Sequence, residues 1–291
     1  MGESYLLLDS PREHHDRLVA ELVTPLAREI RDDPELSSLF YVRLSSPGWQ
    51  VRWRVVGEDG WLAGRYRPLA DRYLAPLREA GVITAVEETR YEPETERYGG
   101  PAGMALAEEL YTLDTLACLD LLELGRQGRL ARTPRELALL LGERLADLLG
   151  LTGERRERYY RFGYGWTEEM GTLEPDELAG LEERYRRLEP DLSALLGGEA
   201  SERPEVLWGG TGAAAVVERF LAGAREVTDR LLAAHARGEI AQHVSYLAWS
   251  YHHLLCNRLG ITPFVEALLS WLMHRHHAGA PLPAPAPAPR A

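Results

Sequence analysis

The sequence contains no lysine, and all 33 of the basic side chains among its 291 residues are arginines. The absence of lysine excludes a lysine Schiff base and the phosphate-binding lysine of P-loop enzymes. Arginine, in contrast, holds a carboxylate by two parallel hydrogen bonds and stays charged when it is buried. The net charge of -12 argues against general nucleic-acid binding, which requires basic residues that neutralise phosphates. This composition suits a protein that binds a small carboxylate through sheltered arginines.

Cysteine and long apolar runs are also scarce. The two cysteines, Cys118 and Cys256, are too few for a disulfide framework, and both lie in apolar helical patterns that indicate core packing. No apolar run approaches eighteen residues, and the N-terminal stretch 1–16 lacks the basic start and long apolar core of a signal peptide. We therefore expect a soluble cytoplasmic protein without membrane contacts.

Motifs for metals, nucleotides and serine hydrolysis are missing. The nine histidines include no HExxH pair, and no GxSxG sequence is present. The glycine-rich stretch 208–212 matches neither a dinucleotide fingerprint nor a Walker loop, which favours a simple connection. We expect no metal and no cofactor.

The first third of the chain predicts a β-α-β-β-α-β order. The expected strands are 3–9, 39–44, 50–56 and 82–91, and the expected helices are 10–31, capped at Ser10-Pro11, and 61–80. This order is that of a ferredoxin-like antiparallel sheet over residues 3–95. Around Arg52, alternation places Val51, Trp53 and Val55 on one side of the strand, and Gln50, Arg52 and Arg54 on the other. The arginines then lie on a sheet face that is either solvated or covered by the rest of the chain.

The remainder predicts a mostly helical half over residues 101–278, packed on the sheet. Thr133 and Glu136 form a capping-box sequence, and the helix that they open is expected to end at Gly150. We expect one α+β domain over residues 1–278, followed by an extended, disordered Pro/Ala tail over 279–291.

The helix expected over 245–260 carries a polar stripe. Tyr246, Ser250, His253 and Asn257 follow each other at helical spacing among mostly apolar neighbours. A buried polar group without a partner costs about 1–3 kcal/mol, so these side chains need partners. They belong either to a satisfied core network or to the lining of a pocket, and the spacing alone leaves both open.

Three stretches of the chain resemble the thiopeptide-type bacteriocin biosynthesis family, which includes the C-terminal elimination domains of lantibiotic dehydratases. They are LFYVRLSSPGWQVRWRV (39–55), YEPETERYGGPAGMALAEELYTLD (91–114) and SYHHLLCNRLG (250–260). Their order and spacing fit the family over nearly the whole chain.

The resemblance implies a reaction that removes glutamate from glutamylated Ser or Thr of a precursor peptide and gives dehydroalanine or dehydrobutyrine. It places the catalytic roles on Arg52, Arg54, Arg97 and His253, with Gln50 in the position of a usual histidine. Histidine suits proton transfer near neutral pH, and arginines suit the binding of a carboxylate and of developing negative charge. The expected substrate-binding residues are Ser250, Tyr246, Asn257, Tyr251, Ser245 and Gln50.

Two other functions stay open. The same family includes thiopeptide pyridine synthases, which join two dehydroalanines in a formal [4+2] cycloaddition and expel the leader peptide. Ser245, Tyr246 and Tyr251 suit that reaction by polarising an amide. A peptide-binding scaffold without catalysis is the third interpretation. We favour elimination because all four residues of that set are retained. The implied partners are a precursor peptide and a separate glutamyl-tRNA-dependent protein that glutamylates it, and the sequence leaves open a homodimer.

Overall fold

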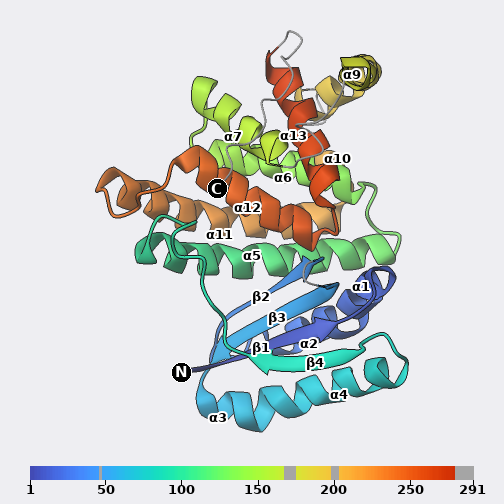
Figure 1. The fold of residues 1–291 in the computed structure, drawn as a ribbon, viewed down its shortest axis with the longest axis vertical. Helices are drawn as coiled ribbons and strands as arrows, with labels where there is room; N and C mark the ends of the chain where they lie inside the picture. Colours follow the sequence, from blue (N-terminus) through green and yellow to red (C-terminus); the bar gives the residue numbers. More distant parts are fainter. Residues whose placement is uncertain (46–47, 167–174, 198–202, 279–291) are drawn as a thin grey trace.

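The structure, a computed structural model, describes residues 1–45, 48–166, 175–197 and 203–278. The expected turn residues Ser46 and Pro47 and the expected tail 279–291 lie outside the described residues. Within the described part, one sheet comes first in the chain and helices follow it (Figure 1), so the α+β class is confirmed. No helix of the described part combines the length and the apolar character that crossing a bilayer requires.

The sheet has four antiparallel strands in the spatial order β2-β3-β1-β4. They are β1 Gly2–Asp9, β2 Leu36–Leu44, β3 Gln50–Gly57 and β4 Ala85–Thr89. The expected strand 82–91 is too long at both ends. Val82 and Ile83 lie in the turn before β4 and are not part of the strand. They are apolar because their side chains are buried in the core.

One face of the sheet packs on two helical segments. The first runs through α1 His15–Leu18, a π-helical turn Val19–Val23 and α2 Thr24–Ile30, and the second through α3 Asp59–Trp61, a π-helical turn Leu62–Tyr66 and α4 Arg67–Glu79. Val51, Trp53 and Val55 of β3 are fully buried on this side, as the alternation predicts. Burial of such apolar side chains contributes roughly 1.5–3 kcal/mol each.

The expected cap at Ser10 is wrong. The Ser10 hydroxyl donates to the carbonyl oxygen of Val82 at 2.7 Å, and the helical segment begins after Pro11 with a 3-10 turn, Arg12–His14, that has no side-chain cap. The proline fits the helix start, but the serine instead ties the end of β1 to the segment after α4.

The second face of the sheet is covered by the helical half. Its helices are α5 Pro101–Arg126, α6 Pro134–Leu148, α7 Gly153–Gly165, α9 Pro175–Gly197, α10 Pro204–Leu207, α11 Thr211–Ala236, α12 Val244–Arg258 and α13 Pro263–Ala278. Helix α5 lies along the sheet, α11 lies beyond α5, α12 reaches β2 with its C-terminal end, and α6, α7, α9 and α13 are farthest from the sheet (Figure 1). The capping box of Thr133 and Glu136 is confirmed, and so is Gly150 after the helix, with φ of 62°.

Helix α12 is bonded directly to the outer edge of the sheet. The Asn257 side chain accepts from the Arg43 backbone nitrogen at 2.7 Å and donates to the Arg43 carbonyl oxygen at 2.5 Å. The next side chain, Arg258, donates through Nε to the carbonyl oxygen of Tyr41 at 3.0 Å. These bonds satisfy backbone groups of β2 that would otherwise lie at an open edge. They also fix the polar stripe of α12 beside the sheet.

Candidate active site

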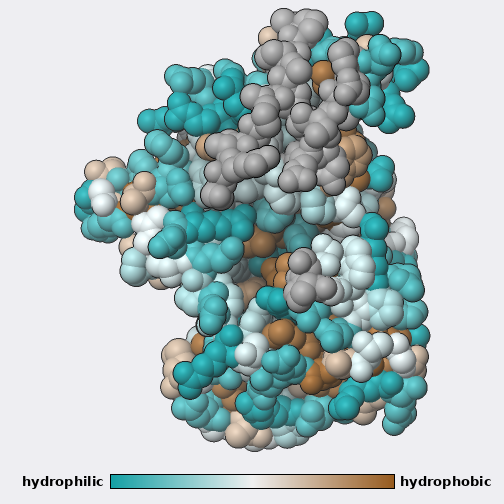
Figure 2. Space-filling view, viewed as in Figure 1, coloured by the Kyte–Doolittle hydropathy of each residue, from teal (hydrophilic) through white to brown (hydrophobic). Residues whose placement is uncertain are grey.

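A cavity of about 460 Å³ lies between the second face of the sheet and helices α5 and α12. In the space-filling view, hydrophobic side chains are visible inside a hollow between the sheet and the helical layer (Figure 2). The volume falls in the usual range for small-molecule sites. The cavity is lined by Tyr5, Leu7, Phe40, Val42, Leu44, Arg52, Thr89, Arg90, Tyr91, Glu92, Glu94, Arg97, Tyr111, His253, Leu254, Asn257 and Arg258.

Arg52 supplies the sheet side of the cavity. Its Nε donates to Oε1 of Gln50 at 3.1 Å, and Nε2 of Gln50 donates to Oδ1 of Asp9 at 2.7 Å. Within the described ranges, neither terminal nitrogen of Arg52 has a hydrogen-bond partner. Gln50 does not line the cavity and orients Arg52. Arg52 therefore keeps its two terminal nitrogens for a ligand.

Arg97 lies in the loop that follows β4 and faces α12. Its Nε donates to Oγ of Ser250 at 3.2 Å, Nη1 lies 3.3 Å from a Glu94 oxygen, and its guanidinium lies 5.3 Å from the centre of the Trp249 ring. The loop is held by Gly99, whose carbonyl accepts from the backbone nitrogen of Ala241 at 3.0 Å. Gly99 has φ of 77°, and a Cβ there would lie 2.7 Å from the Gln242 backbone nitrogen, so only glycine fits this contact.

Arg54 faces the helical half, as predicted, but it does not line the cavity. Its Nε donates to Glu3 and its Nη1 to Glu108 of α5, both at 2.9 Å. The guanidinium also lies 4.3 Å from the centre of the Tyr91 ring, and the side chain is only 11% exposed. Its charge is thus already paired with two carboxylates, and it supports Tyr91, which lines the cavity.

His253 lines the cavity from α12 and is paired on its other side. Its Nδ1 lies 2.8 Å from Oε2 of Glu266, a residue of α13 that is 1% exposed. The Trp166 ring and the imidazole form a T-shaped contact, with ring centres 4.8 Å apart, and the centre of the Trp249 ring lies at 5.8 Å. The imidazole thus contacts two tryptophan rings as well as Glu266, and its side chain is 19% exposed.

The other residues of the expected stripe have different surroundings. Asn257 lines the cavity while it binds β2, whereas Ser245 donates to the carbonyl oxygen of Arg155 at 2.8 Å. Tyr246 packs against Phe162. Tyr251 is buried against Tyr98, and burial raises the pKa of its hydroxyl. Ser245, Tyr246 and Tyr251 are not among the lining residues, while Ser250 acts on the cavity through Arg97.

Three charged residues near the cavity were missed by the sequence interpretation: Glu266, Asp114 and Arg258. Arg258 is fully buried and its Nη1 donates to Oδ2 of Asp114 at 2.9 Å. Complete burial raises the pKa of Asp114 to about 7, although Arg258 acts in the opposite direction. A signal existed for Glu266, because it is an acidic residue within the apolar stretch 264–269 of a helix.

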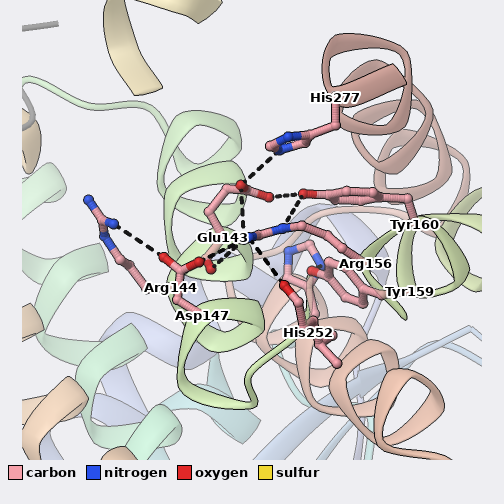
Figure 3. A network of polar contacts seen from close by, with 9 residues as sticks. Glu143, Arg144, Asp147, Arg156, Tyr159, Tyr160, His252 and His277 are labelled. Carbon is pink, nitrogen blue, oxygen red and sulfur yellow. Dashed lines mark hydrogen bonds and ion pairs between the residues drawn. The ribbon is translucent and has the colours of Figure 1, made fainter. Parts of the chain in front are cut away.

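A second polar network lies in the helical half, around Glu143 of α6 (Figure 3). Glu143 accepts from the Tyr160 hydroxyl and from Nη2 of Arg156 at 3.2 Å, and it contacts Nε2 of His277 at 3.0 Å. His252 belongs to this side of α12, because it bonds the Tyr159 hydroxyl at 2.8 Å and the Ala138 carbonyl at 2.9 Å. The two adjacent histidines therefore lie in different surroundings: His252 is a core residue, and His253 lines the cavity.

The described ranges contain no group of three or more histidine, cysteine or acidic side chains that could hold a metal ion. The arrangement around the cavity can instead bind an anion with Arg52 and Arg97 and move a proton with His253.

Comparison with known proteins identifies the family. The family model described as the C-terminal part of lantibiotic biosynthesis dehydratases matches residues 4–278. The chain belongs to this family. This match confirms the family resemblance that the three sequence stretches indicated.

Individual relatives agree with this family. The subtilin biosynthesis protein SpaB of Bacillus subtilis is 29% identical over 111 residues, which is 38% of this chain and 11% of SpaB. The tRNA-dependent lantibiotic dehydratase MibB of Microbispora sp. 107891 is 23% identical, with a TM-score of 0.74, over 95% of this chain and 28% of MibB. This chain therefore spans a small part of both proteins.

Two further solved structures share the fold at a length similar to this chain. The pyridine synthase TbtD from thiomuracin biosynthesis is 19% identical, with a TM-score of 0.62, over 96% of this chain and 98% of TbtD. TsrL is 18% identical, with a TM-score of 0.63, over 95% of each chain. At these identities the likeness shows the fold and leaves the reaction to be argued from the site.

Proposed function

We propose that this protein removes glutamate from glutamylated Ser or Thr side chains of a precursor peptide. The observation that carries the proposal is the arrangement in one cavity of His253, whose Nδ1 is bonded to Glu266, with Arg52 and Arg97. Elimination needs a base for the α-proton and cations for the negative charge that develops, and these side chains supply both.

The reaction is a β-elimination from an ester. Nε2 of His253 takes the α-proton of the modified residue, and the electron pair of the Cα–H bond forms the Cα=Cβ double bond. The Cβ–O bond breaks at the same residue, and glutamate leaves with the electron pair as a carboxylate. No oxidant, reductant or metal enters this balance.

The arginines have separate roles in the proposal. The free terminal nitrogens of Arg52 bind a carboxylate of the glutamyl group. Arg97, with its Nε on Ser250, stabilises the charge on the ester oxygens as the Cβ–O bond breaks. Arg54 acts from behind Tyr91 by maintaining the cavity wall.

The ferredoxin-like character of the sheet and the identity of the partners are also part of this proposal. We interpret the strand order β2-β3-β1-β4 with its two covering helical segments as a ferredoxin-like unit, joined with the helical half in one domain over 1–278. The substrate is a precursor peptide with leader and core, and a separate glutamyl-tRNA-dependent protein attaches the glutamate.

The test compares two peptides by mass spectrometry. Wild-type protein receives a glutamylated precursor and, separately, a fully dehydrated precursor. We expect loss of glutamate from the first peptide, and His253→Ala should reduce that rate by about 10²–10⁴-fold, the usual contribution of an acid–base group. His235→Ala is the matched control, because His235 lies on α11 outside the cavity.

A second candidate function is that of a pyridine synthase, because the pyridine synthase TbtD shares the fold over 96% of this chain. If only the dehydrated peptide reacts and leader peptide is released, the protein is a pyridine synthase and the elimination proposal is wrong. If neither peptide reacts and both bind, the scaffold interpretation replaces both enzymatic ones.

A further inference from the structure

We propose that Glu266 is a positioning residue that fixes the tautomer and the orientation of His253, so that Nε2 is the atom that exchanges the proton with substrate. The proposal rests on the proposed function for its kinetic part. Its structural part, the tautomer of His253, stands independently.

The first argument is the contact itself. Nδ1 of His253 lies 2.8 Å from Oε2 of Glu266, which is a normal length for a hydrogen bond to a carboxylate. An ionised carboxylate only accepts hydrogen bonds, so Nδ1 must carry the proton. In the neutral ring Nε2 then has the free lone pair. Glu266 does not line the cavity, and it therefore acts through His253.

The second argument is that the imidazole has little room to turn. The Trp166 ring forms a T-shaped contact with the imidazole, with the ring planes at 80°, and the plane of the Trp249 ring lies at 33° to the imidazole. Glu266 is itself fixed near the start of α13, where its backbone nitrogen donates to the carbonyl oxygen of Thr262 at 2.9 Å. Rotation of the imidazole would break the bond to Glu266 without giving Nδ1 a new partner.

The third argument concerns charge. When Nε2 takes the α-proton, the imidazole becomes a cation beside a buried carboxylate. Opposite charges attract more strongly where water is excluded, and the attraction is absent while the ring is neutral. Glu266 therefore stabilises the state after proton transfer more than the state before it, which raises kcat and leaves substrate binding unchanged.

A purely structural role for Glu266 explains the site less well. Its second carboxylate oxygen, Oε1, is buried and has no hydrogen-bond partner among the described residues. Buried carboxylates that only support a fold normally have their oxygens satisfied, because an unsatisfied oxygen is costly. Among the described residues, the carboxylate of Glu266 is bonded only through Oε2, to His253.

The kinetic test uses three variants with a glutamylated precursor peptide. Glu266→Gln keeps the size but loses the charge, and Glu266→Ala removes the contact. For Glu266→Gln we expect kcat to fall about 10²–10⁴-fold, comparable to the loss expected for His253→Ala, with little change in KM. Glu182→Gln is the control, because Glu182 pairs with Arg275 in the last turn of α13, at the other end of the helix from Glu266, and its loss should leave kcat unchanged.

The spectroscopic test needs no substrate. Nitrogen-15 spectra of the imidazoles report which ring nitrogen carries the proton, and the signals of His253 are those that disappear in His253→Ala. We expect the Nδ1–H tautomer in the wild type and a mixture of tautomers in Glu266→Gln, because an amide can either donate or accept.

The outcomes separate the two proposals. Wild-type protein that does not release glutamate, but shows the Nδ1–H tautomer, refutes the proposed reaction and keeps the positioning role. An Nε2–H tautomer in the wild type refutes the positioning role even if Glu266→Gln fails to fold. Full kcat in a folded Glu266→Gln, with glutamate release intact, also overturns it.

Discussion

The substitution Gly163→Ala should push helix α13 away from helix α7. Gly163 faces Ser270 of α13, and a Cβ at this glycine would lie 2.3 Å from Oγ and 2.7 Å from Cβ of Ser270. The hydroxyl can rotate away, but the Ser270 Cβ cannot, so the two helix backbones must move apart. The same shift moves Glu266, one helical turn before Ser270, relative to His253.

The magnitude follows from two opposing effects. Overpacking of a tight contact typically costs about 1–3 kcal/mol. Replacing glycine by alanine inside a helix returns about 1 kcal/mol through helix propensity. Gly180 is the matched control, because it is an exposed residue inside α9 and a Cβ there would meet nothing within 4 Å. We expect the free energy of unfolding of Gly163→Ala to lie about 1–3 kcal/mol below that of Gly180→Ala.

Urea denaturation followed by tryptophan fluorescence measures this difference, and the glutamate-release assay measures its effect on the site. Adding Ser270→Ala to Gly163→Ala removes the contact with Oγ but not the one with Cβ, so it should restore only part of the stability. The reasoning is refuted if the two alanine variants are equally stable, or if Gly163→Ala is the more stable.

Two further predictions follow from the site and its surroundings. Burial lowers the pKa of His252 from its usual 6.5, so the unfolded chain binds more protons than the folded protein below that pH. The free energy of unfolding should therefore fall as the pH is lowered from about 7.5 to about 5.5. Denaturation at both pH values should give a smaller fall in His252→Gln than in wild type, and an equal fall would contradict this assignment. Arg54→Lys keeps the charge, but one ammonium cannot bond Glu3 and Glu108 while it stacks on Tyr91, so turnover of glutamylated peptide should drop. The exposed Arg65→Lys should not change turnover, and full activity of Arg54→Lys would show that the planar guanidinium is not needed.

Much of the sheet was predictable because its signals are local. Alternation around Arg52 identified the strand, its buried face and the side on which the arginines lie. The error at Val82 and Ile83 has a physical cause: both are apolar and β-branched, which is typical of strands, but a buried loop needs the same side chains. Ser10 was misassigned because a serine before a proline suits a helix cap, while its actual acceptor, Val82, is 72 positions away.

The site was predictable only in part, because its contacts join distant segments. His253, Arg52 and Arg97 line one cavity, and the sequence motifs named all three. The pairing of Arg54 with Glu3 and Glu108 depends on how α5 crosses the sheet, which no local pattern encodes. The partner of His253 was missed for the same reason, since Glu266 comes from the following helix.

The closure of the β2 edge by α12 decides where the sheet remains open. Among the described strands, β4 pairs only with β1, so its outer edge is the one at which another strand would add. Its exposed residues include Glu87 and Glu88, and the Glu88 carboxylate is paired with Arg67 at 2.7 Å. Two copies that met edge to edge along β4 would bring their Glu87 carboxylates close together, which opposes strand pairing. The bonds of Asn257 and Arg258 with β2 hold the candidate catalytic helix, and they also leave β4, a short and acidic strand, as the open edge of the described sheet at which aggregation could begin.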